Sequence, residues 1–160
     1  MRYKASGFHL DGPIDSEGLQ YRTAASVTIV KGDVLFDNGS GLATNACTSE
    51  FSESEAFLGV AAADCASGGT VVFIPPLPHY HFWVVNGGAT VAAVSDIGEL
   101  IDLYASTPNK VDTSDTTITQ GYWGFMVDEI DVSAEALAAD GVAVTAGGFV
   151  KGHFMKKATA

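Results

Sequence analysis

The amino-acid sequence predicts a mainly β protein: a small β-barrel or sandwich with one short helix and an extended N-terminal arm. Apolar, β-branched runs at 27–30, 57–62 and 71–74 are separated by segments rich in Gly, Asn, Asp and Ser. Turn signals recur every ~8–12 residues along the chain, which is the spacing of short strands in sandwiches and barrels. No long stretch has the period of an amphipathic helix, so a helical bundle or coiled coil is excluded.

Each strand is predicted from an apolar run that ends at a turn. Asp37-Asn38-Gly39 predicts a turn because Asn and Gly tolerate positive φ. Pro75-Pro76 ends a strand because proline cannot donate a ladder hydrogen bond. Asn86-Gly87, between two apolar runs, predicts a β-hairpin. The predicted strands span 27–30, 34–36, 42–43, 57–62, 71–74, 79–85, 89–94, 100–104, 116–119, 122–130, 142–144 and 148–154.

The helix is predicted at 133–139, where Ser133 can cap the first turn and Glu135 lies favourably within it. Residues 1–22 have neither helix nor strand periodicity and are predicted to form an extended arm. The β-rich body is expected at 23–154, and a basic C-terminal tail at 155–160. A chain of 160 residues is long enough to bury a core of its own.

Net charge, apolar run length and cysteine spacing limit the binding partners and the cellular compartment that we expect for the protein. The net charge of −11 excludes a nucleic-acid partner, because phosphate binding requires clustered Lys and Arg. No apolar run approaches the ~20 residues that a membrane span needs, so no membrane association is expected. No signal-peptide pattern is present, and we expect synthesis in the cytoplasm. Cys47 and Cys65 match no zinc or redox spacing; two free thiols are expected, with a disulfide as the alternative.

His79-Tyr80-His81 is the sharpest local cluster of metal-binding side chains. Residues i and i+2 of a strand point to the same face, so both imidazoles would reach one ion, and His153 would complete the set. The pair resembles the start of a cupin metal site, but that site also needs a Glu a few residues later, and residues 82–87 contain none. We therefore predict no metal and no other cofactor. A cupin-like metal-binding enzyme using His79 and His81 remains the alternative.

No other segment indicates catalysis, and we predict that the protein is not an enzyme. The sequence contains no GxSxG nucleophile elbow and no glycine-rich phosphate loop. The acidic cluster Asp128, Glu129 and Asp131 would suit Ca²⁺, although alternating carboxylates on an exposed strand are usually only solvated. A glycan-binding adhesin domain is a further alternative. Its sugar-stacking aromatics would be Tyr80, Trp83 and Trp123, with core or trimer contacts as the simpler interpretation.

Several strand-and-turn segments resemble those of tailed-phage capsid decoration proteins, which are also called head-stabilisation or cement proteins. The resemblance extends from about residue 26 to residue 154. The segments that carry it are VTIVKGDVL at 27–35, FLGVA at 57–61, TVVFIP at 70–75, SDIG at 95–98, DLY at 102–104 and GFMVDEID at 124–131.

This resemblance implies a non-enzymatic virion protein that binds the outside of an icosahedral capsid in many copies and stabilises the contacts between capsomers. The implied partners are the major capsid protein and further copies of the chain, as a homotrimer. Five of the eight basic residues lie near the termini, whereas all nineteen acidic residues lie between Asp11 and Asp140. We expect the basic ends to dock on an acidic neighbour; the alternative is that they only keep loose termini soluble. The residues expected to contact the partner are Arg2, Tyr3, Lys4, Phe8, Lys156 and Lys157.

Overall fold

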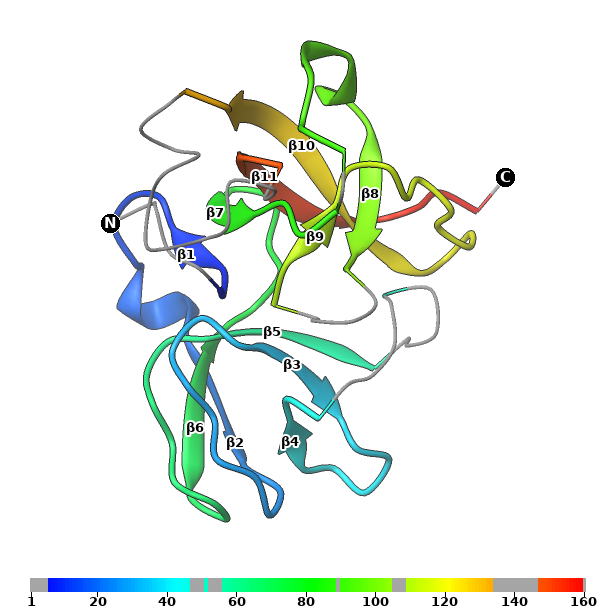
Figure 1. Cartoon of the computed structure of the whole chain (residues 1–160). Coiled ribbons are helices and arrows are strands. Elements are labelled where there is room, and N and C mark those ends of the chain that lie inside the picture. The colour runs from blue at the N-terminus through cyan, green and yellow to red at the C-terminus, as the bar shows by residue number, and fades with distance from the viewer. Residues whose placement is uncertain are drawn as a thin grey trace.

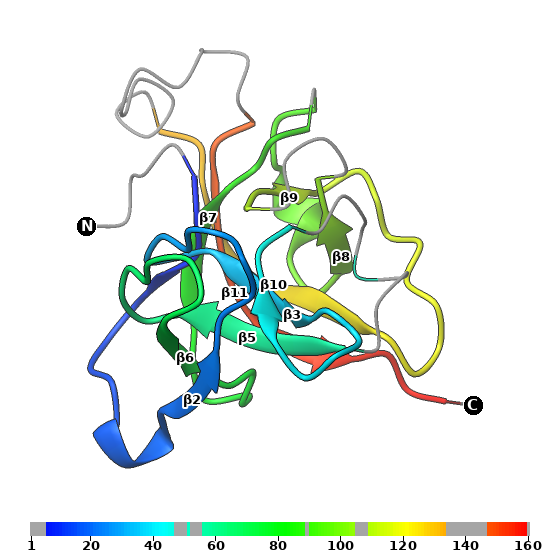
Figure 2. The same cartoon turned by 90° about the horizontal axis from the view of Figure 1, so that it is seen from below.

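The computed structural model of the chain consists of two antiparallel β-sheets that pack against each other through a shared apolar core (Figures 1 and 2). It describes residues 6–46, 51, 56–88, 90–104, 109–133 and 147–159. Strands account for 41% of the structure, and no helix reaches seven residues among the described segments. The predicted mainly β class is therefore confirmed. No closed barrel forms within the described part of the chain.

The larger sheet has six strands, and its two longest members, β10 and β11, lie near its centre. Its strand order is β1 (His9–Leu10), β7 (Phe82–Val85), β11 (Phe149–Lys156), β10 (Trp123–Asp131), β8 (Leu100–Leu103) and β9 (Val111–Asp112). Neighbouring strands are antiparallel throughout this sheet. A short 3₁₀ helix, η3 (Val94–Asp96), precedes β8.

The smaller sheet has five strands and contains most of the N-terminal half. Its order is β2 (Gln20–Thr23), β6 (Thr70–Ile74), β5 (Phe57–Ala61), β3 (Val34–Asp37) and β4 (Ala43–Thr44). A second 3₁₀ turn, η1 (Ser16–Gly18), leads into β2. Strand β2 forms one edge and is mostly exposed.

Aromatic side chains between the sheets form the main core. The ring of Phe154 lies at its centre, and its centroid is 4.9 to 5.7 Å from those of Phe8, Phe51, Phe57, Phe82 and Phe125. The alternation of β7, β10 and β11 turns Phe82, Phe125 and Phe154 to this inner face. A second apolar cluster, which includes Leu35 and Phe73, covers the opposite face of the smaller sheet.

Six of the predicted strands are confirmed by paired strands of the structure: 34–36, 57–62, 71–74, 100–104, 122–130 and 148–154. The predicted strand at 27–30 is wrong, since only Ile29 forms a bridge, to Cys65. The predicted strand at 116–119 has no ladder partner. The predicted helix at 133–139 lies outside the described residues beyond Ser133, and the predicted strand at 142–144 lies wholly outside them.

The predicted hairpin at Asn86-Gly87 is wrong, because β7 pairs with β1 and β11 and not with the segment that follows Asn86. The Asn86 side chain is buried. Its amide nitrogen donates hydrogen bonds to Thr113 Oγ1 at 3.0 Å and to the Thr90 carbonyl at 2.9 Å. The backbone at Asn86 also forms a parallel bridge with Val111. After Asn86 the chain therefore turns toward β9 and η3 and does not return beside β7.

The described part of the predicted arm belongs to the two sheets. Phe8 is 1% exposed, β1 pairs with β7, and β2 pairs with β6. Residues 6–22 therefore help to build the body and are not an independent extended segment. At the other end, β11 continues to Lys156, past the predicted start of the tail at 155. None of the helices in the described segments has the length and hydropathy of a membrane-spanning helix.

Candidate functional site

The face of the larger sheet that points away from the aromatic core carries a group of polar side chains, which we call the outer face. In β11 the outward residues are Lys151 and His153, which alternate with the inward Val150, Gly152 and Phe154. Lys151 pairs with Trp83 of β7, and Gly152 pairs with Phe82. Continuing that register by one residue places His81 opposite His153.

A β-bulge in β10 brings a carboxylate to the same place. Val127 pairs with Gly152 and Glu129 pairs with Lys151, so Asp128 is an extra residue without a partner in β11. A bulge of this kind turns two consecutive side chains to one face of the sheet. Bulges commonly change the direction in which a side chain points. Asp128 and Glu129 therefore both lie on the outer face.

His81, Asp128 and His153 converge into a compact trio, which we call the His–Asp–His cluster. The Nδ1 atoms of His81 and His153 each lie 2.9 Å from Asp128 Oδ2, and the two ring centroids are 5.2 Å apart. One potential ligand atom from each residue lies within 4.8 Å of the others. The side chains are 36%, 30% and 19% exposed for His81, Asp128 and His153, so the cluster opens to solvent.

Lys151 lies next to this cluster and is held by two carboxylates. Its Nζ is 2.8 Å from Asp11 Oδ2 and 2.8 Å from Glu129 Oε2. Hydrogen bonds to Asp11 and then to Glu129 raise the pKa of the Lys151 ammonium group, against the opposing effect of partial burial. The same ammonium lies 6.0 Å from the centre of the Trp83 ring, within the range of a cation–π contact. Asp11, Glu129 and Lys151 together therefore carry one net negative charge beside the histidines.

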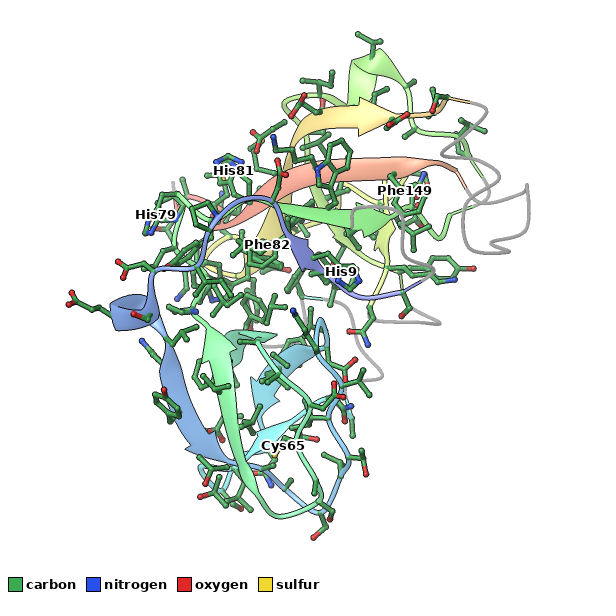
Figure 3. All side chains as sticks on the ribbon, turned by 90° about the vertical axis from the view of Figure 1, so that its left-hand side faces the viewer. His9, Cys65, His79, His81, Phe82 and Phe149 are labelled. Atoms are coloured by element: carbon green, nitrogen blue, oxygen red, sulfur yellow. The ribbon has the colours of Figure 1, made fainter. Side chains whose placement is uncertain are left out.

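The structure brings together two of the three histidines considered as an alternative metal site and leaves out the third. His79 lies in the turn before β7 and is exposed, and its ring packs on Tyr80 with centroids 4.2 Å apart (Figure 3). The expected pairing of His79 with His81 across one strand face is wrong, because the strand begins only at Phe82. Asp128 takes the third position. The sequence marked it as part of an acidic cluster but held no signal for the bulge that aims it.

Three of the residues expected to contact a partner, Phe8, Lys156 and Lys157, are among the described residues, and they differ in exposure. Phe8 is buried in the aromatic core, which corrects its assignment as a contact residue. Lys156 is exposed, with Nζ 5.5 Å from the centre of the Trp123 ring. Lys157 is half-buried and its backbone bonds to Tyr122 and Gly121. Arg2, Tyr3 and Lys4 lie outside the described residues.

Two of the three aromatics considered for sugar binding are buried. Tyr80 is 4% exposed and Trp83 is 6% exposed, so neither offers an open ring face for stacking. Trp123 packs edge-on against Phe57, with ring centroids 5.6 Å apart. Cys65 is a buried free thiol, while Cys47 lies outside the described residues.

Among the described residues, exposed apolar side chains gather on two surfaces considered below. The first lines a hollow of about 540 Å³ between segment 6–14 and the smaller sheet, where Ile14 is 40% and Val30 54% exposed. The second, which we call the 91–97 surface, surrounds η3 and contains Val91, Val94 and Ile97. Val94 is 77% exposed, the highest value among the large apolar side chains described.

These two surfaces lie near opposite edges of the larger sheet. The hollow is lined by His9 and Leu10 of edge strand β1. The 91–97 surface adjoins β8 and β10 toward the other edge, where the Gly98 N–H bonds to the Val127 carbonyl. In Figure 1, η3 is at the top of the molecule, well away from β1.

Comparison with known proteins gives no family for this chain. No protein-family model matches it, and no curated protein has a significantly similar sequence.

Proposed function

We propose that this protein is a non-enzymatic capsid decoration protein of a tailed phage. It binds the outside of an icosahedral shell in many copies and contacts both the major capsid protein and other copies of itself. Its place of action is the virion exterior, after synthesis in the host cytoplasm. The observation that carries the proposal is the pair of separate exposed apolar surfaces on a single two-sheet body.

The sequence segments that suggested this family form a connected scaffold. Segments 57–61 and 70–75 correspond to β5 and β6, and segment 27–35 leads into β3; these three strands are hydrogen-bonded neighbours. Segments 95–98 and 102–104 flank and enter β8, which pairs with β10 in segment 124–131. The resemblance therefore concerns strands that pair in space and not scattered apolar runs.

Two binding surfaces suit a protein that holds neighbouring shell subunits together. A cement protein must contact more than one subunit, and the hollow and the 91–97 surface lie far enough apart to do so. Large exposed apolar side chains are common sites of protein contact when they gather on one surface. A weak contact repeated by symmetry over a whole shell slows the loss of any one subunit through multivalency.

A shell-binding assay with a charge inserted into one surface tests the proposal. Val94→Asp places a carboxylate in the centre of the 91–97 surface, and burying a valine contributes roughly 1.5–3 kcal/mol. We expect purified Val94→Asp to bind shells, assembled from the capsid protein of the same genome, about tenfold or more weakly than the unmodified chain. Ser67→Asp adds the same charge in an exposed turn of the smaller sheet and is the matched control.

Cosedimentation of the unmodified chain and of the two variants distinguishes the possible outcomes. Cosedimentation that is lost for Val94→Asp and kept for Ser67→Asp supports the proposal and assigns the shell contact to the 91–97 surface. If the unmodified chain does not cosediment with shells at micromolar concentration, the proposal is wrong. Thermal unfolding of both variants checks that each is folded before its binding is compared.

A further inference from the structure

We propose that His81, Asp128 and His153 form a binding site for one divalent transition-metal ion of the Zn²⁺ class. The site is independent of shell binding. It departs from the sequence-based prediction of no metal and also from the alternative His79–His81–His153 set, because His79 takes no part and a carboxylate of β10 supplies the third ligand. Three properties of these side chains support the site: their convergence, their chemistry and the rigidity of the backbone that carries them.

The spacing of the ligand atoms is close to that of ligands on a common ion. In a tetrahedral zinc site with bonds of about 2.0–2.1 Å, neighbouring ligand atoms lie about 3.3 Å apart. The two Nδ1 atoms each lie 2.9 Å from Asp128 Oδ2, and the whole set lies within 4.8 Å. Side-chain rotations that bring the three ligand atoms to this common separation would admit an ion between them.

The donor set favours a particular class of metal. Two imidazoles and one carboxylate suit Zn²⁺, Fe²⁺, Co²⁺ or Ni²⁺, whereas Ca²⁺ and Mg²⁺ prefer sites made of oxygen ligands. An ion would replace the protons by which the two Nδ1 atoms bond to Asp128. Three protein ligands leave at least one coordination position for water, and the half-exposed cluster gives solvent access to it.

The backbone beneath the cluster is held in place by the sheet. His153 and Asp128 lie in β11 and β10, and His81 directly precedes β7; these strands are adjacent in the larger sheet. The inner face of the same strands is packed by Phe82, Phe125 and Phe154, each at most 1% exposed. Ligands on such a scaffold need little ordering when an ion binds.

Neighbouring charges also favour a cation. Lys151 is the basic residue nearest the cluster along β11, and its ammonium is paired with both Asp11 and Glu129. These three residues together add one net negative charge beside the negative Asp128. An approaching divalent ion therefore meets an acidic surface.

Calorimetric titration with Zn²⁺ tests the site, on protein first stripped with a chelator. We expect one ion per chain with micromolar or tighter affinity, and a loss of affinity of at least tenfold in Asp128→Asn and in His153→Gln. His79→Gln is the matched control, because it removes an exposed histidine two residues from His81 and should change affinity less than twofold. At an ion concentration about 100 times the Kd, Zn²⁺ should raise the Tm of the unmodified chain by about 5–10 °C.

Co²⁺ provides a second readout that does not depend on the variants folding. Visible absorption typical of low-coordinate Co²⁺ should develop to one equivalent and be displaced by Zn²⁺. The proposal is overturned if the unmodified chain binds no Zn²⁺ below 100 μM, a limit of about 5.5 kcal/mol. It is equally overturned if His79→Gln weakens binding as much as Asp128→Asn does, with both variants folded in the chelator by circular dichroism.

Discussion

Asp128 and Glu129 are consecutive in the chain, yet their carboxylates both lie on the outer face of the larger sheet. Asp128 bonds to His81 and His153, whereas Glu129 pairs with Lys151. Consecutive residues of a regular strand lie on opposite faces, so this arrangement depends on the bulge at Asp128. The inner face is undisturbed, because Val127 and Ile130 still point into the core.

Deleting Asp128 should therefore be tolerated by the fold. The remaining residues keep the register that pairs Val127 with Gly152 and Glu129 with Lys151. We expect the deletion to change the free energy of unfolding by less than about 1 kcal/mol while abolishing Zn²⁺ binding. Deleting Met126, two residues earlier, would turn one half of β10 to the wrong face and should leave little folded protein. Urea unfolding of the two deletions compares them, and equal damage would contradict the assignment of the bulge.

The buried Asn86 should be one of the most sensitive polar positions. Its side chain donates to Thr113 Oγ1 and the Thr90 carbonyl and accepts from the Gly88 and Thr113 backbone N–H groups. Asn86→Ala leaves several of these groups buried without partners, so we expect a loss of about 3 kcal/mol of stability. Asn38→Ala, in an exposed turn, should cost less than about 1 kcal/mol. Similar urea midpoints for both variants would refute this role of Asn86.

Gly59 in β5 should be irreplaceable for steric reasons. Its φ is +143°, and a Cβ added there would lie 2.1 Å from the Ile74 carbonyl oxygen of the neighbouring strand. We expect Gly59→Ala to lower stability by roughly 3 kcal/mol or more, because backbone must shift in two strands. Gly68→Ala meets nothing within 4 Å and should cost only the roughly 1–2 kcal/mol of its positive φ. Thermal unfolding measures both, and a mild effect at Gly59 would count against the close approach of β5 and β6.

Asp37 should make part of the stability depend on acidic pH. The N–H of Gly39 donates a hydrogen bond to it and, with Gly41 and the Arg22 guanidinium, outweighs burial and lowers the pKa of this carboxyl below its ordinary 3.8. A lowered pKa gives stability that is present above the unfolded-state value and lost as pH falls through the folded-state value. Between about pH 5 and pH 2, the urea midpoint of the unmodified chain should therefore fall more steeply than that of Asp37→Asn. Parallel curves would show that Asp37 contributes nothing to this dependence.

Much of the fold could be predicted from local sequence patterns. Apolar runs bounded by turn residues located β3, β5, β6, β8, β10 and β11. The predictions that are wrong concern side chains whose contacts come from segments distant in the sequence. Phe8 stands alone in a polar stretch, so no periodicity indicates that it contacts Phe125 and Phe154. Asn86-Gly87 matches a hairpin turn locally, but Thr113 and Val111 provide its bonding partners.

For the same reason, the sequence indicates only some of the ligands of the candidate metal site. His81 and His153 could be named as ligands by residue type, whereas their proximity depends on the pairing of β7 with β11. Asp128 depends on a bulge, and a bulge is defined only when two strands are aligned. The sequence pattern includes His79 because it predicts a strand that begins at residue 79, whereas β7 begins at Phe82.

The number of copies of this chain on assembled phage particles tests the central claim most directly. Particles produced from the genome that encodes the chain are purified by density gradient, and the ratio of this chain to the major capsid protein is measured by quantitative mass spectrometry. A decoration protein should be present at a fixed ratio set by the symmetry of the shell, and it should be removable without loss of the shell protein. Absence of the chain from purified particles, or a variable trace amount, would contradict the proposed function.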